Sequence, residues 1–297
     1  IRGGIENSDL VGERYGSLNG IEGVDNDQII SLEHFRDADR LALLMQTPSS
    51  YLGSCRKKLP TAAEDAEFYS RIMSVLKKHN IGYFFYIGGN DSMDTADKLS
   101  RYAADIGDDI RIVGIPKTID NDLAVTDHTP GYGSAAKYIA TTCMELSKDV
   151  HVYGSGVITL VEIMGRHAGW LAASSALAAE FGSGPDLIYL PECNFDMDNF
   201  IEDVLNLYHS KGRAFIAVSE GVHFADGKYV AEAKISATDG FGHVQLGGLA
   251  ATLAAKLKSL TGAKIRGIEL SLLQRCGSHI ASQTDIDEAF LAGKTAV

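Results

Sequence analysis

The residues with the clearest chemical potential form a short acidic loop, Pro116-Lys117-Thr118-Ile119-Asp120-Asn121-Asp122. It directly follows an apolar stretch at 110–115, which predicts a buried strand. The lysine offers a point charge to phosphate oxygens. The two carboxylates repel each other, but the pair makes sense if one faces a Mg²⁺ ion and the other takes the proton of a hydroxyl group. The alternative is an acidic, solvated loop, because Asp and Asn are common in turns.

A second candidate is the turn Gly88-Gly89-Asn90-Asp91-Ser92, which lies between an apolar run at 83–87 and a helical pattern at 93–102. Paired glycines let the backbone approach an anion, and the N–H groups at the start of a helix favour phosphate. The turn and the acidic loop together predict two halves of one phosphate site. A plain turn between strand and helix, with Asp91 or Ser92 as the N-cap, is the alternative.

Further polar residues follow later strands. Arg166, within Met164-Gly165-Arg166, and Glu220 each come directly after an apolar run. Ligands of open α/β sheets collect at the carboxyl ends of strands, so the arginine is a candidate for binding phosphate or sugar, and the glutamate can accept sugar hydroxyls. A surface turn is the alternative for Glu220. The basic loop 52–58, which contains Arg56, is either an anion clamp or a solvated charge run.

The composition of the chain excludes several functional classes. With 297 residues, 45% of them hydrophobic, and 31 glycines, it is typical of a soluble α/β enzyme with many tight turns. A net charge of -12 argues against a nucleic-acid surface. The four cysteines form no C-x-x-C pair, so we expect reduced thiols in a cytoplasmic protein. No apolar run approaches membrane-spanning length, so we expect no membrane partner.

The elements that must position these residues alternate between helix and strand. A helix is predicted over 62–78, with acidic residues in its first turns and lysines in its last, and the strand 83–87 follows it. Such alternation is typical of a doubly wound parallel sheet. The later predicted strands are 156–163, 186–190, 214–218 and 265–273. The later predicted helices are 135–147, 170–181, 198–211 and 245–260.

Seven ordered blocks of residues closely resemble the phosphofructokinase family, and the match runs nearly end to end. Their common order makes the resemblance far more specific than any single motif. The blocks are Leu52-Gly53-Ser54-x-Arg56, Gly88-Gly89-x-x-Ser92, Pro116-x-Thr118-Ile119-Asp120-Asn121-Asp122, Thr126-Asp127, Met164-Gly165-Arg166, Ser219-Glu220 and Gln274-Arg275-x-Gly277.

The resemblance implies an enzyme that phosphorylates the 1-hydroxyl of fructose 6-phosphate. It implies an α/β fold of two doubly wound lobes with mainly parallel sheets and the active site in the cleft between them. Residues 1–132 with 274–297 are expected to form the phosphoryl-donor lobe, and 133–273 the sugar-phosphate lobe. We also expect the family's first strand and its usual C-terminal end to be missing from this sequence.

By this resemblance, Asp120 accepts the proton of the sugar hydroxyl, and Asp122 belongs to the Mg²⁺ region. Asn90 stands where many members place an aspartate near the metal, so metal contact there would be indirect or weaker. Arg266 matches an arginine that a neighbouring subunit contributes, so we expect a homo-oligomer. The other residues of the implied sugar-phosphate site are Thr118, Ile119, Met164, Gly165, Arg166, Glu220 and Arg275.

Asp91 and Lys117 indicate the phosphoryl donor. ATP-dependent members usually have glycine at both positions, whereas pyrophosphate-dependent members have an aspartate and a lysine. A carboxylate at Asp91 would repel the α-phosphate of a nucleotide, while Lys117 would neutralise charge on a compact pyrophosphate. We therefore expect a reversible reaction with bare phosphate as the leaving group. The residues expected to bind the phosphoryl donor are Gly88, Gly89, Ser92 and Lys117. The residues expected to be catalytic are Lys117, Asp91, Arg56 and Asp120.

Other functions stay open. An ATP-dependent 6-phosphofructokinase is the alternative within the family, and a catalytically silent regulatory subunit that binds sugar phosphate is a second. A dinucleotide-binding dehydrogenase is weaker, because the glycine pair lacks the full G-x-G-x-x-G spacing.

Two residues depart from the family pattern. Val157 and Leu272 stand where ATP-dependent relatives commonly have an arginine and a histidine in the sugar-phosphate pocket, so we expect other residues to bind the phosphate of the sugar in this chain.

Overall fold

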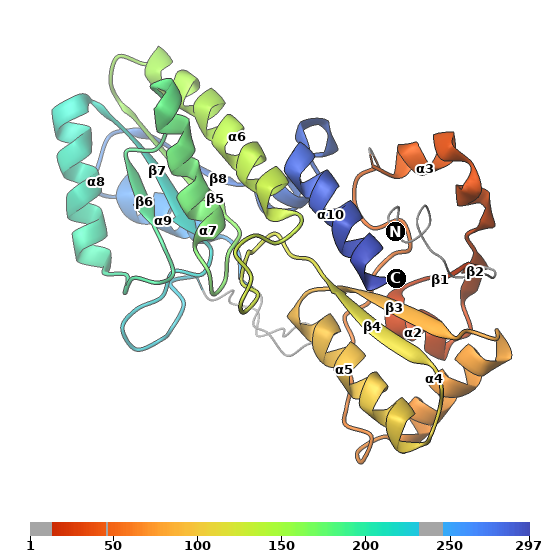
Figure 1. Ribbon diagram of the computed structural model, residues 1–297. Coiled ribbons are helices and arrows are strands. Elements are labelled where there is room, and N and C mark those ends of the chain that lie inside the picture. Colours follow the sequence, from red (N-terminus) through yellow and green to blue (C-terminus); the bar gives the residue numbers. More distant parts are fainter. Residues whose placement is uncertain (1–13, 46, 232–245) are drawn as a thin grey trace. The chain divides into compact units, whose positions relative to one another are not determined.

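The computed structural model describes residues 14–45, 47–231 and 246–297 of the chain. The chain divides into two compact units, whose elements are labelled in Figure 1. Of the described residues, the first unit contains 14–45, 47–118 and Gln283–Val297, and the second contains 119–231 and 246–282. This division differs from the expected boundaries, because residues 119–132 and 274–282 belong with the second unit.

The first unit holds two small sheets. β3 (Tyr83–Gly88) and β4 (Arg111–Pro116) pair in parallel, which confirms both strands that the apolar runs predict. β1 (Tyr15–Ser17) and β2 (Ile29–Ser31) form an antiparallel pair. The parallel pair is the part that matters for the candidate site, because both of its strands end at the predicted phosphate-binding segments.

Helices α4 (Ala66–Lys78) and α5 (Asn90–Asp105) build the core of the first unit with this sheet. α4 begins four residues later than predicted, because the Asp65 side chain caps it by accepting the Phe68 N–H at 3.0 Å. The other helices of the unit are α2 (Gly20–Asp25), α3 (Ala38–Leu44), α10 (Gln283–Ala296) and the 3₁₀ helix η1 (Glu33–Arg36).

The second unit is built on a four-stranded parallel sheet with the order β6-β7-β5-β8. Its central strands β5 (Val157–Ile163) and β7 (Arg213–Ser219) are apolar almost throughout and buried. β6 (Leu187–Tyr189) and β8 (Lys264–Glu269) are the outer strands. Since all four run in the same direction, their carboxyl ends lie at one edge of the sheet.

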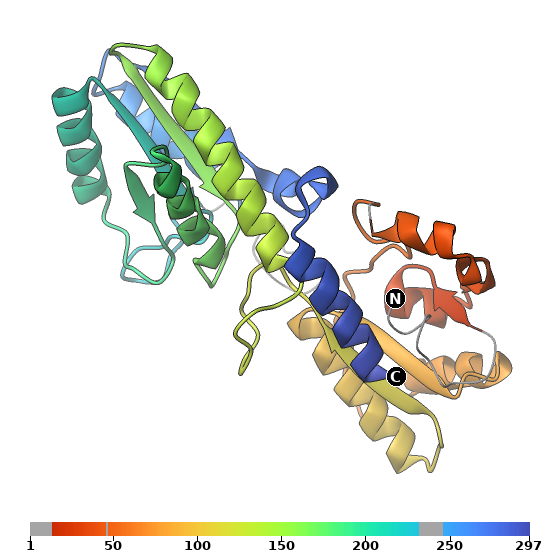
Figure 2. The same ribbon diagram turned by 45° about the horizontal axis from the view of Figure 1, so that its top comes forward.

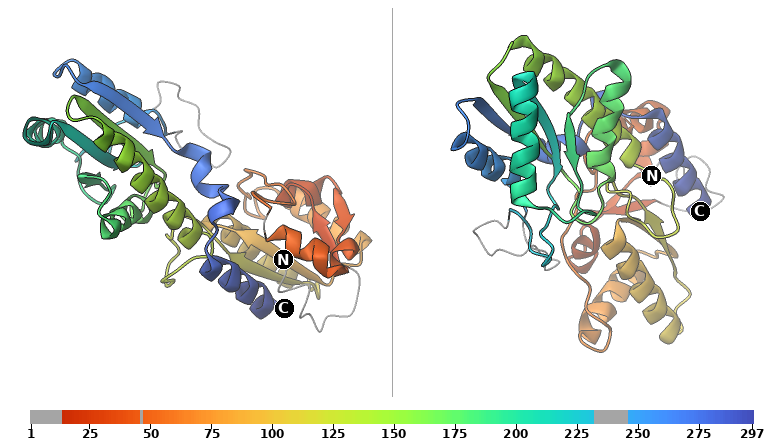
Figure 3. Two further views of the ribbon diagram at one scale, coloured as in Figure 1. Left: turned by 90° about the horizontal axis from the view of Figure 1, so that it is seen from above. Right: turned by 90° about the vertical axis from the view of Figure 1, so that its left-hand side faces the viewer.

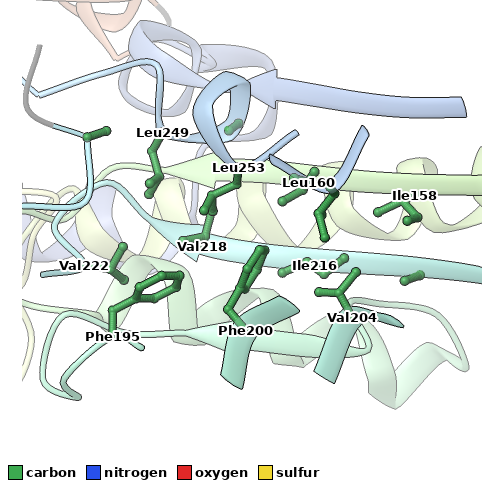
Figure 4. Packing of buried hydrophobic residues seen from close by; sticks show 14 of the residues in the cluster. Ile158, Leu160, Phe195, Phe200, Val204, Ile216, Val218, Val222, Leu249 and Leu253 are labelled. Carbon is green, nitrogen blue, oxygen red and sulfur yellow. The ribbon is translucent and has the colours of Figure 1, made fainter. Parts of the chain in front are cut away.

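Helices cover both faces of this sheet, as Figure 3 shows. On one face, Ile158 and Leu160 of β5 pack with Phe200 and Leu253, which belong to α8 (Met197–Lys211) and α9 (Leu249–Lys258) (Figure 4). The next residues along β5 face the opposite way, toward α6 (Tyr132–Val152), which runs along the strand in Figure 2, and α7 (Trp170–Ser174). The second unit is therefore doubly wound, as the alternation of elements predicts.

Two predicted elements are wrong in part. The helix expected over 170–181 ends at Ser174 and continues as the 3₁₀ helix η2 (Ser175–Phe181). Ser174 and Ser175 donate their hydroxyls to the carbonyls of Leu171 and Ala172, both at 2.6 Å, and such bonds compete with the regular helical pattern.

The strand expected over 265–273 ends at Glu269. The chain then turns into two short 3₁₀ helices, η3 (Ser271–Arg275) and η4 (Ser278–Ile280). Gln274 helps to close the first of these turns, since its side-chain amide donates to the Ser271 carbonyl at 3.1 Å. An apolar run of this kind does not reveal in the sequence where the strand stops.

In the described parts of the chain, no helix is both long and apolar enough to cross a membrane. All four cysteines are free thiols.

Candidate active site

The turn that follows β5 is held by three hydrogen bonds from distant segments. The Met164 N–H donates to Oε1 of Gln274 at 3.2 Å, and the Gly165 N–H donates to Oε1 of Glu220 at 3.3 Å. The Ser219 hydroxyl donates to the Gly165 carbonyl at 2.6 Å. Gly165 has φ +136, and a Cβ there would lie 2.6 Å from the Ala168 carbonyl oxygen, so the turn requires glycine. The result is a fixed backbone that carries Arg166.

The turn that follows β7 lies directly against this first turn. The Glu220 N–H donates to the Ile163 carbonyl at 2.8 Å, which extends the pairing of the two strands. A Cβ on Gly221 would lie 2.0 Å from the Arg166 carbonyl oxygen, so only glycine permits this approach. The structure thereby brings Arg166 and Glu220 together, as their positions at strand ends predict.

Burial and several nearby charges affect the pKa of the Glu220 carboxyl group. Burial raises its pKa above the ordinary value, and the nearby charges of Asp120 and Glu269 raise it further. The Gly165 N–H and the Arg166 guanidinium lower the same pKa. Asp120, Arg166 and Glu220 are therefore close enough to influence one another, which is the grouping that a sugar and its phosphate would need.

The acidic loop is ordered by a residue between its two aspartates. The Asn121 side chain is buried, and its Oδ1 accepts the N–H of Thr129 at 2.9 Å and the hydroxyl of Thr129 at 3.1 Å. Its Nδ2 donates to the Asp127 carbonyl at 3.1 Å. Asp120 and Asp122 thus flank a pinned residue, which argues against a merely solvated loop. Ile119 packs against the hydrophobic cluster beneath α6, which is a structural contact.

In the first unit, the glycine turn lies beside Lys117. The Lys117 N–H donates to the Gly88 carbonyl at 2.9 Å, and a Cβ on Gly88 would lie 2.0 Å from the Ser92 hydroxyl oxygen. The N-cap of α5 is Gly89, and no side chain caps the helix. The alternative of an Asp91 or Ser92 cap is therefore wrong, because both residues lie inside the first turn of α5. The start of this helix keeps the form of an anion-binding turn.

The boundary between the two units runs through the acidic loop. Lys117 and Thr118 belong to the first unit, and Asp120 and Asp122 belong to the second. Asn90, the other expected metal ligand, begins α5 in the first unit.

Three other residues lie outside these clusters or at their edges. Arg56 lies in an exposed position in a loop of the first unit. Arg275 is in η3, next to Gln274, and so lies near the turn that Gln274 holds. Arg266 is paired in register with Thr159, in the middle of β5 rather than at its carboxyl end. The second unit therefore does not bring Arg266 to the turn that carries Arg166.

Sequence reasoning recognised the block that contains Gln274 but gave this residue no role. It is 3% exposed, and it bonds a backbone group 110 residues away. The sequence likewise predicts no role for Asn121, which lies between two aspartates. The signal that could have identified Gln274 and Asn121 is their position, at the end of an apolar run and between two candidate catalytic aspartates. A polar side chain that is buried at such a place needs a hydrogen-bond partner. Val157 is buried in the core, whereas Leu272 is exposed on η3.

Comparison with protein families matches residues 5–291 to the family described as phosphofructokinase. The chain belongs to the phosphofructokinase family. This confirms the membership that the seven blocks predict.

Several phosphofructokinases are similar to this one. The pyrophosphate–fructose 6-phosphate 1-phosphotransferase of Xanthomonas campestris pv. campestris (strain B100) is 45% identical over 285 residues, which are 94% of this chain and 67% of that protein. The protein of the same name from Methylococcus capsulatus is 42% identical over 292 residues, 97% of this chain and 69% of that protein. The crystal structure of a pyrophosphate-dependent phosphofructokinase from Nitrosospira multiformis is 36% identical, with a TM-score of 0.84 over 100% of this chain and 71% of that one.

Proposed function

We propose that this phosphofructokinase transfers a phosphoryl group reversibly from pyrophosphate to the 1-hydroxyl of fructose 6-phosphate, giving fructose 1,6-bisphosphate and phosphate. The observation that carries the proposal is the position of Asp91 in the first turn of α5, after a glycine pair that bonds the Lys117 backbone. A carboxylate there repels the α-phosphate of a nucleotide, whereas a lysine suits a compact pyrophosphate. Relatives at 45% and 42% identity are named for the same reaction, which supports this assignment.

Each unit contributes one part of the chemistry. In the first, Lys117, Arg56 and the amides of the glycine turn neutralise charge on the phosphoryl group. In the second, Arg166 and Glu220 hold the sugar phosphate, with Met164, Gly165, Ile119 and Arg275 lining the rest of its site. Thr118, which belongs to the first unit, is the remaining residue that we propose for sugar binding. The sugar oxygen attacks phosphorus in line, the bond to the leaving phosphate breaks, and Asp120 takes the hydroxyl proton.

The donor atoms of Asp122 and Asn90 fit a magnesium ion. A carboxylate and an amide both offer oxygen, which is the ligand atom that Mg²⁺ prefers. Asp122, in the second unit, would be a charged ligand of the ion, and Asn90, in the first unit, would be a weaker one because it is uncharged. Bound Mg²⁺ would neutralise charge on the phosphate oxygens.

The proposal is tested with the full chain, fructose 6-phosphate and Mg²⁺, with pyrophosphate or ATP as the donor. We expect turnover with pyrophosphate only, and some gain of ATP use in Asp91→Gly. Asp97→Gly is the matched control, because Asp97 is an exposed aspartate on the same helix that pairs with Arg101. ATP turnover equal to pyrophosphate turnover would contradict the donor assignment. No turnover with either donor would favour the regulatory-subunit alternative.

We also propose a homo-oligomer in which Arg266 reaches the site of a neighbouring subunit. The Arg266 guanidinium bonds Asp149 at 2.8 Å and the Tyr153 hydroxyl at 3.3 Å, on the outer strand β8. Mixing the inactive variants Asp120→Asn and Arg266→Ser should restore part of the activity, because some sites then combine both intact residues. An active, strictly monomeric enzyme would contradict this role.

A cytoplasmic location is proposed as well, supported by the four free thiols, which suit a reducing compartment. The protein would bind fructose 6-phosphate and pyrophosphate, and neither a nucleic acid nor a membrane.

A further inference from the structure

Glu162 is a buried acid that the proposed mechanism does not use. It lies on β5 and is 2% exposed. Two residues at alternate positions of the same strand, Ile158 and Leu160, pack into the hydrophobic cluster between the sheet and α9 (Figure 4). Burying an ionisable group in such a layer is costly unless its charge or its hydrogen bonds are put to use.

The Glu162 side chain holds the start of α9. Its Oε2 accepts the Ala250 N–H at 2.8 Å, across 88 residues of sequence. The helix has no cap of its own, because its N-cap residue is Gly248, at φ +76, and no side chain bonds there from that position. A carboxyl group at this place does what an N-cap residue normally does, and it complements the positive end of the helix.

The backbone around Glu162 joins two further segments of the sugar-phosphate site. The Glu162 carbonyl accepts the Leu270 N–H at 3.1 Å, immediately before η3, which carries Arg275. The next carbonyl, that of Ile163, accepts the Glu220 N–H at 2.8 Å. Glu162 therefore lies where α9, η3 and the Glu220 turn meet the end of β5.

The carboxyl group also lies within the field of two other acids. Glu162 is paired in register with Glu269 of β8, and Glu220 follows the end of β7. Burial raises the pKa of Glu162 to about 7, and both of these neighbours raise it as well, while the amides at the start of α9 lower it. From α9 itself no acidic residue lies in the first turn, and its basic residues, Lys256 and Lys258, are in the last.

One oxygen of Glu162 has a different environment from the other. Oε1 is buried and has no hydrogen-bond partner among the residues that the structure describes. When Glu162 is ionised, Oε1 carries part of the negative charge without a hydrogen bond to stabilise it, and protonation of the carboxyl group removes that charge. The protonated and ionised forms of Glu162 therefore differ in their attraction to the α9 amides and in their repulsion of Glu220.

We propose that Glu162 is a positioning residue of the sugar-phosphate site, which holds the start of α9 on the end of β5 and adjusts the charge that Glu220 experiences. This role rests on the proposed function. Glu162 itself touches no reacting atom, and it acts on the sugar phosphate through Glu220 and through the segments that it ties together.

The first test measures the pH dependence of kcat and of KM for fructose 6-phosphate in Glu162→Gln. The glutamine oxygen still accepts the Ala250 N–H, but the charge is gone. Because burial raises the pKa of Glu162 to about 7, this acid gains its charge only as the pH rises through neutrality. We therefore expect KM to rise about twofold or more between about pH 6 and about pH 8 in the unaltered protein, and we expect this rise to be absent in Glu162→Gln. We expect kcat to stay within about twofold, because no catalytic group is removed.

Glu269→Gln is the matched control, since it removes a neighbouring, exposed carboxylate but leaves Glu162 in place, so the rise in KM between about pH 6 and about pH 8 should persist. A Glu162→Gln profile that coincides with that of the unaltered protein, or with that of Glu269→Gln, would overturn the proposal.

A second test needs no variant that might fail to fold. Hydrogen exchange of the first turn of α9 is measured in the unaltered protein, with and without fructose 6-phosphate. We expect slower exchange at Leu249 and Ala250 when the sugar phosphate binds, and unchanged exchange there would refute the coupling. A thermal-shift measurement in parallel reports binding itself, so that absence of any binding counts against the proposed function instead.

Discussion

Removing the Asn121 side chain is expected to loosen the loop that carries Asp120 and Asp122. Asn121 makes three side-chain hydrogen bonds, two with Thr129 and one with the Asp127 carbonyl. It also has φ +55, a left-handed conformation that asparagine tolerates better than alanine. Substitution therefore acts on the side-chain bonds and on the backbone, and the two effects can be separated.

The expected magnitudes follow from these two contributions. Three hydrogen bonds at about 0.5–1.5 kcal/mol each amount to about 1.5–4.5 kcal/mol. The left-handed backbone adds roughly 1 kcal/mol for alanine but not for glycine. Asn121→Ala should thus lower the free energy of unfolding by about 2.5–5.5 kcal/mol, and Asn121→Gly by about 1 kcal/mol less. Displacement of Asp120, the proposed proton acceptor, should lower kcat about 10²-fold in both variants.

Asn80 provides the matched control, because it has φ +52 and an exposed side chain at the end of α4. Asn80→Ala should cost only the backbone contribution, about 1 kcal/mol. Urea-induced unfolding and steady-state kinetics measure both pairs of variants. Equal losses of stability in Asn121→Ala and Asn80→Ala would refute the reasoning, since the buried hydrogen bonds would then contribute nothing.

Three further perturbations test the second unit. Gly221→Ala should lower the free energy of unfolding by about 1–3 kcal/mol and raise KM for fructose 6-phosphate, because its Cβ would meet the Arg166 carbonyl. Gly262→Ala is the control, because its Cβ would lie in open space, and it should change neither the free energy of unfolding nor KM. Gln274→Leu leaves the Met164 N–H without its acceptor, so KM should rise more than kcat falls; an unchanged KM would contradict this role. The raised pKa of Glu162, about 7 in the folded state against 4.5, means that the folded state binds the extra proton. The unfolding free energy should therefore fall by about 3 kcal/mol as the pH rises from about 4.5 to about 7, and Glu162→Gln should lack this fall in urea titrations across that range.

Much of the candidate site follows from local sequence. The glycine pair with Asp91, the Lys117 loop and the Arg166 turn each lie directly after an apolar run, and strand ends of this kind are visible in a single sequence. The order of these blocks was enough to predict the family, which the comparisons confirm. The parallel α/β architecture was equally predictable, because helix and strand differ in the period of their apolar residues.

Tertiary structure decided which distant residues support those blocks. Gln274 bonds Met164 across 110 residues, and Glu162 bonds Ala250 across 88. Neither pairing could be predicted, because it depends on the strand order β6-β7-β5-β8 and on the exact register of β5 with its neighbours. The same holds for Gly221, whose need for glycine arises only where two strand-end turns meet. Local sequence therefore determined the chemistry that this protein can offer, whereas the packing of strands far apart in the chain decided how that chemistry is held in place.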